Sequence, residues 1–324
     1  MAKVTVVIPN YNGEKFMKDC LDSLLAQRSA EDDGPDFDII IVDNGSTDAS
    51  PEIIKGFMSP RLRLIRLDKN YGFSRAVNEG IKASESEYVI LLNNDTVVMP
   101  DFVDKLAKAI EADDKIFSVN ARMLKMSESE KLDSAGDLYC ALGWAFARGK
   151  DKQASLYDKR SDIFSACAGA AIYRRSVFDE IGYFDEEHFA YLEDVDIGYR
   201  ARINGYRNVY EPEAAVLHAG SGSSGSRYNK FKIDLSSRNN VYVVYKNMPL
   251  IQLLINLPFL AAGTLIKVLF FVKKGEGITY LRGLCKGFAL CFRSHKYPYR
   301  NKNLSNYVRI QLELWGNIFA RVFG

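Results

Sequence analysis

The stretch YVILLNNDTVV, residues 88–98, is an apolar run that ends abruptly in two amides and a carboxylate. Its length and β-branched composition predict a buried strand. Asn93, Asn94 and Asp95 are costly to bury unless other groups satisfy their polar atoms. We therefore expect a charged ligand or partner at this end of the strand.

This strand is one of several in the first 120 residues, where β-rich runs alternate with segments of helical periodicity. This alternation is typical of a parallel sheet covered by helices, an α/β fold. The expected strands are residues 4–8, 39–42, 62–67 and 89–92. The expected helices cover residues 16–25 and follow Ser50 (as the cap, with Pro51 first in the helix), Ser74 and Pro100. Polar residues follow the strands, and ligands bind at the carboxyl ends of strands in such sheets.

The chain changes character twice, which predicts three parts with the boundaries 1–116, 117–246 and 247–324. The middle part is mixed, with helices expected after Arg175 and over residues 194–204. The last part opens with more than 20 largely apolar residues, enough to span a membrane. A basic amphipathic segment over residues 278–293 follows, of the kind that lies in an anionic membrane surface. Whether residues 250–272 span a membrane, lie on it or form a homo-oligomer interface stays open in the sequence.

Charge and cysteine content exclude several classes of protein. The formal net charge is +2, which gives no indication of a nucleic-acid partner, but residues 247–324 carry 11 Lys and Arg against 2 Asp and Glu. The C-terminal part is thus strongly basic and the rest acidic. The five cysteines are an odd number without a C-x-x-C pair, which favours a reducing compartment. No secretory signal is recognised before residue 4, so we expect a cytoplasmic protein, peripheral on the inner face of the cell membrane.

Four segments in order carry a resemblance to a known family: VVIPNYNG at 7–14, IIIVDNGSTD at 39–48, NNDT at 93–96 and YLEDVDIGYR at 191–200. Together they resemble a family 2 inverting glycosyltransferase of the GT-A fold, in the rhamnosyltransferase-like branch, over residues 4–245. The resemblance implies a nucleotide-sugar-binding half at 1–116 and an acceptor-binding, catalytic half at 117–246. A helical extension at 247–324 would serve membrane attachment or oligomerisation.

Such a transfer needs a metal for the leaving diphosphate and a base for the attacking hydroxyl. The resemblance makes Asp95 the ligand of Mg²⁺ or Mn²⁺, with Asn93 replacing the first Asp of the family's D-x-D at the nucleotide. It makes Asp194 the general base, with Glu193 beside it at the start of a helix. Left open are a capping role for Asp95 and a cluster of helix-capping acids around Asp194.

The resemblance also implies how the donor is held. Asp43 would accept the imide N–H of a uracil or thymine ring, and Pro9 with Tyr11 would pack against that ring. The nucleotide cleft would be lined by Asn70, Gly72 and Asn78. A tight turn around Asp43 and an ordinary helix start after Gly72 are the structural alternatives.

Three further residues complete the expected site. His218 is expected at the metal or the diphosphate, although a lone histidine after an apolar run is usually structural. Arg238 is a candidate phosphate partner or an ordinary surface cation. Gly169 would bring backbone against a sugar, or serve close packing.

We therefore predict an inverting glycosyltransferase that uses a nucleoside diphosphate sugar, dTDP-rhamnose or a UDP-hexose. The acceptor would be a hydroxyl of a glycan or lipid-linked glycan in cell-surface polysaccharide or glycoprotein glycan synthesis. The alternatives are a sugar nucleotidyltransferase, which usually needs a glycine-rich loop where this chain has PNYNG, and an inactive scaffold subunit of a glycan assembly complex.

Overall fold

The computed structural model describes residues 2–27, 37–57, 59–220 and 229–323. Twelve strands lie in the described part: β1 (Val4–Asn10), β2 (Phe37–Asn44), β3 (Leu62–Leu67), β4 (Tyr88–Leu92), β5 (Thr96–Val98), β6 (Ile116–Lys125), β7 (Glu128–Ser134), β8 (Asp137–Cys140), β9 (Trp144–Ala147), β10 (Ser161–Ile163), β11 (Ala170–Arg174) and β12 (Arg207–His218). The α-helices there are α1 (Glu14–Leu25), α2 (Ser50–Lys55), α3 (Phe73–Ala83), α4 (Phe102–Glu111), α5 (Arg175–Ile181), α6 (Glu193–Ile203), α7 (Lys230–Asn247), α8 (Leu250–Lys273), α9 (Gly277–Cys291) and α10 (Leu304–Phe323).

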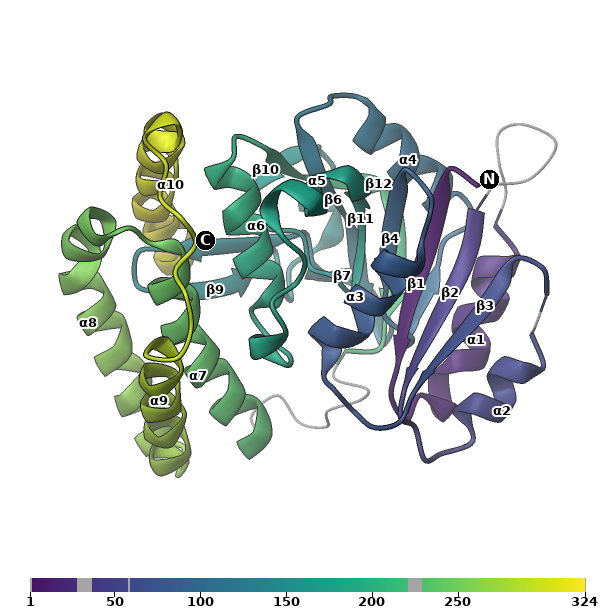
Figure 1. Ribbon diagram of the computed structural model, residues 1–324, viewed down its shortest axis with the longest axis horizontal. Coiled ribbons are helices and arrows are strands. Elements are labelled where there is room, and N and C mark those ends of the chain that lie inside the picture. Colours follow the sequence, from purple (N-terminus) through teal and green to yellow (C-terminus); the bar gives the residue numbers. More distant parts are fainter. Residues whose placement is uncertain (1, 28–36, 58, 221–228, 324) are drawn as a thin grey trace.

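One twisted sheet of ten strands forms the centre of the molecule (Figure 1). Its main order is β10-β12-β6-β11-β4-β1-β2-β3, with β5 paired to β12 and β7 paired to β6. Strands β4, β1, β2 and β3 run parallel, whereas β11 lies antiparallel between β4 and β6. The parallel strands all end at the same edge, so the polar residues that follow them are brought together.

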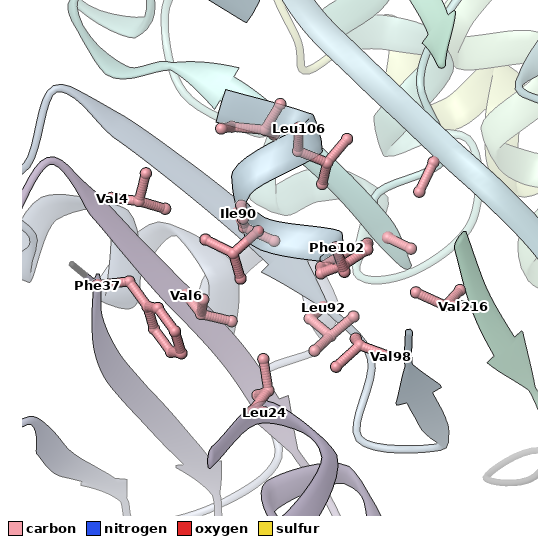
Figure 2. Close-up of a cluster of buried hydrophobic side chains, with 14 of the residues drawn as sticks. Val4, Val6, Leu24, Phe37, Ile90, Leu92, Val98, Phe102, Leu106 and Val216 are labelled. Atoms are coloured by element: carbon pink, nitrogen blue, oxygen red, sulfur yellow. The ribbon is translucent and has the colours of Figure 1, made fainter. Parts of the chain in front are cut away.

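Helices cover both faces of this sheet. Helices α1, α2 and α4 share one buried cluster with strand residues such as Val6 and Ile90, and Figure 2 shows Leu24 of α1 and Phe102 of α4 facing these strands. Helices α3, α5 and α6 share a second cluster with the opposite-facing residue Val7. This alternation of buried side chains follows from the two-residue period of a strand.

The four C-terminal helices pack beside the sheet rather than on it (Figure 1). Helix α10 buries Tyr307 and Leu314 with Tyr139 of β8 and Tyr199 of α6. Helices α7 and α9 pack closely: a Cβ on Gly287 of α9 would stand 2.6 Å from the carbonyl oxygen of Arg238 on α7. Glycine at this position allows the two helix backbones to approach.

Helix α8 is largely exposed, and its buried residues are Gln252, Asn256 and Gly263. Among the described residues it is the one helix long and apolar enough to cross a membrane, judged by length and composition alone. A mainly apolar groove of about 660 Å³ runs between the start of α8, residues 297–299 and α10.

The predicted α/β fold with a C-terminal helical extension is confirmed. The four expected strands are present, each at or beyond its predicted bounds. The predicted cap at Ser50 is wrong, because α2 begins at Ser50 itself and the Ser50 hydroxyl bonds the side chains of Asn10 and Asp48 instead. The boundaries at 116 and 246 stay predictions, since strands from both sides of residue 116 share the sheet.

Candidate active site

The end of β2 holds a buried carboxylate. Asp43 is 1% exposed, and its Oδ1 accepts a hydrogen bond of 3.0 Å from Nδ2 of Asn10, the last residue of the neighbouring β1. Nε of Arg66 lies 3.7 Å from the other carboxylate oxygen. Parallel pairing of β1 with β2 sets Asn10 opposite Asp43, so the register itself creates this contact.

The residues that end the apolar run of β4 are each satisfied by a partner. Nδ2 of Asn94 donates to Oδ1 of Asn10 at 2.8 Å, and the backbone N–H of Asn93 donates to the carbonyl of Gly169 at 2.9 Å. A Cβ on Gly169 would stand 2.9 Å from Nδ2 of Asn93, so a larger residue there would displace the Asn93 amide. Asp95 meets His218, at the end of β12.

His218 bridges two carboxylates. Its Nε2 lies 3.3 Å from Oδ1 of Asp95 and its Nδ1 lies 2.8 Å from Oδ2 of Asp133, which also pairs with Lys150 at 2.7 Å. Burial disfavours the imidazolium, but the bonds to Asp133 and Asp95 outweigh it and raise the pKa of His218 to about 9. Burial likewise opposes the charge on Asp133, yet His218 and Lys150 hold the pKa of Asp133 well below its usual range.

This arrangement fits a divalent cation. A metal between Asp95 and Nε2 of His218 would take the place of the imidazolium proton, while Asp133 keeps hold of Nδ1. Metal-bound histidines commonly donate their other ring N–H to a carboxylate, which fixes the ring and strengthens the ligand. One carboxylate and one imidazole leave coordination positions for phosphate oxygens and water, as Mg²⁺ and Mn²⁺ require.

Asp194 lies at the second residue of α6, next to Asp137 of β8. Ligand atoms of Asp137, Asp194 and Cys167 all lie within 4.8 Å of one another. Burial raises the pKa of Asp194 to about 6, against hydrogen bonds from the Val195 N–H and from Asp137 that favour its ionised form. Burial and the charge of Asp194 raise the pKa of Asp137 well above its usual value. The two carboxyls therefore titrate as a coupled pair, and the pKa of each lies above its usual value.

Glu193 is the other acid of the expected pair, and it is 7% exposed. Burial and the charge of Asp194 raise the pKa of Glu193 well above its usual value. Its Oε2 has no hydrogen-bond partner among the described residues. Burial thus disfavours the ionised form of Glu193, whose side chain lies beside Asp194 at the start of α6.

The turn that leads into α6 is strained. Phe189, Tyr191 and Leu192 have φ values of 61°, 71° and 68°, a region that residues with a Cβ seldom adopt. Each such residue costs on the order of 1–3 kcal/mol, and strain of this kind persists only where surrounding contacts impose it. The strain is concentrated immediately before the candidate base.

Two sets of polar contacts meet where Asn94 and Asp95 follow each other in the chain. Asp43 contacts Asn10, Asn10 contacts Asn94, and Asp95 contacts His218, which contacts Asp133. Asp137, which lies beside Asp194, follows Asp133 by four positions in the chain. The expected nucleotide and metal residues thus lie at neighbouring strand ends, and the expected base lies at the start of α6.

Two of the expected nucleotide residues shape the loop between β3 and α3. Oδ1 of Asn70 accepts bonds from Asn44 Nδ2 at 3.0 Å and from the Gly72 N–H at 2.9 Å. Gly72 has φ +89°, and a Cβ there would stand 2.5 Å from the carbonyl oxygen of Phe189. Glycine at this position lets the loop touch the strained turn before α6.

Asn78 and Arg238 have protein partners. The Asn78 amide donates to the carbonyl of Phe184 at 2.8 Å and accepts from its N–H at 3.1 Å. Nη2 of Arg238 donates to the carbonyl of His188 at 2.9 Å. Pro9 is half-buried and Tyr11 is exposed, beside Asn10. The ligand-binding roles of these residues stay predictions.

Three polar residues of this site were not singled out from the sequence. Asp133 and Asp137 come from β7 and β8, whose mixed pattern gave no functional signal, and Asn239 of α7 contacts the strained turn. Asn10, one of the polar residues at the end of β1, connects Asp43 to Asn94.

The model of the family described as "Glycosyl transferase family 2" matches residues 5–182, which include β1, β2, β4 and the acidic strand ends. The chain belongs to glycosyl transferase family 2. This membership confirms the predicted family and the predicted class of enzyme, a glycosyltransferase.

Two relatives with known names are similar in sequence to this family 2 enzyme. An N-acetylglucosaminyl-diphospho-decaprenol L-rhamnosyltransferase of Mycobacterium tuberculosis is 28% identical over 229 residues, which cover 63% of this chain and 73% of the relative. A poly-beta-1,6-N-acetyl-D-glucosamine synthase of Staphylococcus epidermidis is 25% identical over 212 residues, covering 65% of this chain and 48% of the relative. The chain thus spans about half the length of the synthase.

Solved structures share the fold. GalNAc-T7 with UDP, GalNAc and Mn²⁺ gives a TM-score of 0.59 at 16% identity, covering 75% of this chain and 48% of that one. Residues 1–349 of S. aureus TarS in complex with UDP-GlcNAc give 0.56 at 20% identity, covering 87% and 79%. These similarities confirm the predicted GT-A architecture of the family 2 enzyme.

Proposed function

We propose that the protein transfers one sugar from a nucleoside diphosphate donor to a hydroxyl of a glycan or lipid-linked glycan, with inversion at the anomeric carbon. Nucleotide sugars in neighbouring structures and the diphospho-decaprenol-linked acceptor in the name of the rhamnosyltransferase support this class of substrates. dTDP-rhamnose and UDP-hexoses are the donors proposed, for cell-surface polysaccharide or glycoprotein glycan synthesis. The observation that carries the proposal is the placing of Asp43, Asn94 and Asp95 at neighbouring strand ends, with Asp194 and Asp137 paired at the start of α6.

Asp194 is the proposed general base. Its carboxylate accepts the proton of the acceptor hydroxyl while the acceptor oxygen forms a bond to the anomeric carbon and the bond to the diphosphate oxygen breaks. One in-line displacement of this kind inverts the centre. A base with a pKa of about 6 is mostly ionised near neutral pH and still accepts a proton readily. The hydrogen bond with Asp137 favours the ionised form of Asp194.

Asp95 and His218 are the proposed ligands of Mg²⁺ or Mn²⁺. The metal, when bound, neutralises charge that develops on the departing diphosphate. Asn93 in place of the family's first Asp leaves the site with one negative charge fewer. The geometry supports the assignment because Asp133 holds Nδ1 of His218 and so orients the ring with Nε2 toward Asp95.

Asp43 is the proposed reader of the nucleotide base. A carboxylate accepts the imide N–H of uracil or thymine, which cytosine and adenine lack. Asn10 donates a hydrogen bond to this carboxylate, and Arg66 lies beside it. Tyr11 and Pro9 flank this strand end and would pack on the ring.

The C-terminal helices are proposed to attach the enzyme to the inner face of the cell membrane. Exposed apolar side chains gather on α8, α9 and α10, including Leu250, Ile251, Leu254, Leu257, Leu265, Leu269, Ile278, Leu281, Phe288, Leu304, Leu312 and Phe319. The net charge of +9 over residues 247–324 would favour a surface of anionic lipids. A lipid surface explains both the apolar exposure and the excess of positive charge, whereas a homo-oligomer interface explains the first alone.

A donor-turnover assay with two variants tests the proposal. Release of nucleoside diphosphate that depends on an acceptor supports transfer, pyrophosphate-dependent exchange would indicate a nucleotidyltransferase, and donor binding without either would indicate a scaffold. Asp43→Ala should abolish the stabilisation that the donor gives in a thermal shift. Asp194→Asn should keep that stabilisation and abolish turnover. Full turnover by Asp194→Asn would refute the proposed mechanism.

A further inference from the structure

Helix α7 contacts the strained turn before α6 through Arg238, which bonds the His188 carbonyl, and above all through Asn239. Nδ2 of Asn239 lies 2.9 Å from the carbonyl oxygen of His188, 2.9 Å from that of Ala190 and 2.7 Å from that of Tyr191. The Asn239 side chain is fully buried. An amide carries two N–H groups, so these two donors serve three acceptors and one N–H is shared.

These three carbonyls belong to the part of the chain where strain is concentrated. Phe189, Tyr191 and Leu192 all have positive φ, and the turn needs outside contacts to hold that conformation. Asn239 contacts carbonyls on both sides of Phe189 and the carbonyl just before Leu192. The conformation of the turn sets where α6 begins, and Asp194 is the second residue of that helix.

A second set of contacts from α7 fixes the acid next to the base. Nζ of Lys246 lies 2.9 Å from Oδ2 of Asp196 and Nδ2 of Asn247 lies 2.7 Å from Oδ1 of Asp196, which also pairs with Arg200. Burial opposes the charge on Asp196, yet Arg200 and Lys246 hold the pKa of Asp196 well below its usual range. Both carboxylate oxygens of Asp196 thus have partners within the protein. Asp194, by contrast, lies beside Asp137.

We propose that Asn239 is a positioning residue for the base: its amide holds the turn 188–191 so that Asp194 meets the acceptor hydroxyl. The proposal rests on the proposed role of Asp194. Asn239 itself touches neither partner of the reaction. A displacement of about 1 Å at a reacting group costs on the order of 100-fold in rate, so loss of this contact should lower kcat far more than it alters donor binding.

The test uses the full chain with Asn239→Leu, which keeps a similar side-chain size and removes both N–H donors. Tyr245→Phe is the matched control, because it removes a hydrogen bond from the same helix to the carbonyl of Ser294, away from the turn. We expect kcat to fall by about 100-fold in Asn239→Leu, with the donor dissociation constant within about two-fold of wild type. Tyr245→Phe should keep wild-type kcat.

Asn239→Ser provides a second variant that retains one O–H donor in a smaller side chain, and its kcat should lie between those of wild type and Asn239→Leu. A folded variant of either kind with wild-type kcat would overturn the proposal, as would a loss of donor binding equal to the loss of kcat. Asp194→Asn is measured in parallel. If that variant keeps turnover, the proposed base is wrong whatever the Asn239 variants do, so the two failures are distinguishable.

Discussion

Removal of the hydrogen bond between Asp137 and Asp194 should shift the acid limb of the pH–activity profile to higher pH. Burial raises the pKa of Asp194 to about 6, and a hydrogen bond with Asp137 opposes this rise. A hydrogen bond to a charged acceptor contributes about 1.5–3 kcal/mol. At 1.36 kcal/mol per pKa unit, loss of the bond in Asp137→Leu should raise the pKa of Asp194 by about 1–2 units, to about 7–8.

The sign of the effect follows from the role of Asp194. A base must be ionised to act, so activity is lost as pH falls through the pKa of the base, and a higher pKa moves this loss to higher pH. Asp137→Asn keeps an N–H donor toward Asp194 and removes the second titrating carboxyl. Its acid limb should therefore stay near that of wild type.

The assay is kcat against pH from about 5 to about 9 at saturating donor and acceptor, where the profile reports groups in the bound complex. Wild type should lose half of its activity near pH 6, as an apparent value for the pair of carboxyls. An acid limb of Asp137→Leu at or below the wild-type position would refute the reasoning. Equal shifts in the Leu and Asn variants would refute it too, because the hydrogen bond would then not be the cause.

Three further predictions test the metal site, the loop after β3 and the C-terminal helices. Asp133→Asn should weaken Mn²⁺ binding by about 10–100-fold in calorimetric titration, because His218 loses its orienting charge; equal affinity would contradict the site. Gly72→Ala should lower the free energy of unfolding in urea by about 1–3 kcal/mol, because a residue with a Cβ is strained at this positive φ. An unchanged urea midpoint would contradict this strain. The double variant Ile278→Asp and Phe292→Asp should reduce sedimentation with anionic liposomes by more than about ten-fold, whereas Leu156→Asp, an exposed apolar site outside these helices, should not. Wild-type sedimentation by the double variant would count against membrane attachment.

The sequence predicts the parallel half of the sheet well, because its signals are local. The apolar run before Asn93 and the strand periodicities each report on neighbouring residues. The positions of Asp43 and Asp95 at strand ends follow from the same local pattern, since parallel strands end at a common edge.

The contacts between distant elements were not predictable from local pattern. Asp137 meets Asp194 across 57 positions because β8 lies beside the start of α6. Asn239 reaches the turn at 188–191 from a helix about 50 residues later, and Asn78 bonds a backbone segment 106 residues away. No periodicity in one segment specifies such a partner, so the supports of the site become visible only in three dimensions.

The packing of α10 has a practical consequence for anyone who shortens the chain to obtain a more soluble enzyme. The backbone N–H of Ala141, just after β8, donates to the carbonyl of Leu314, and Asn317 donates to the carbonyl of Tyr139 within that strand. A truncation before residue 304 would strip one side of the strand that carries Asp137 and expose an aromatic cluster to water. Deletion of the apolar C-terminal helices would therefore weaken the support of Asp137 and of the proposed base beside it, and substitutions of exposed residues on α8 and α9 are the safer route to solubility.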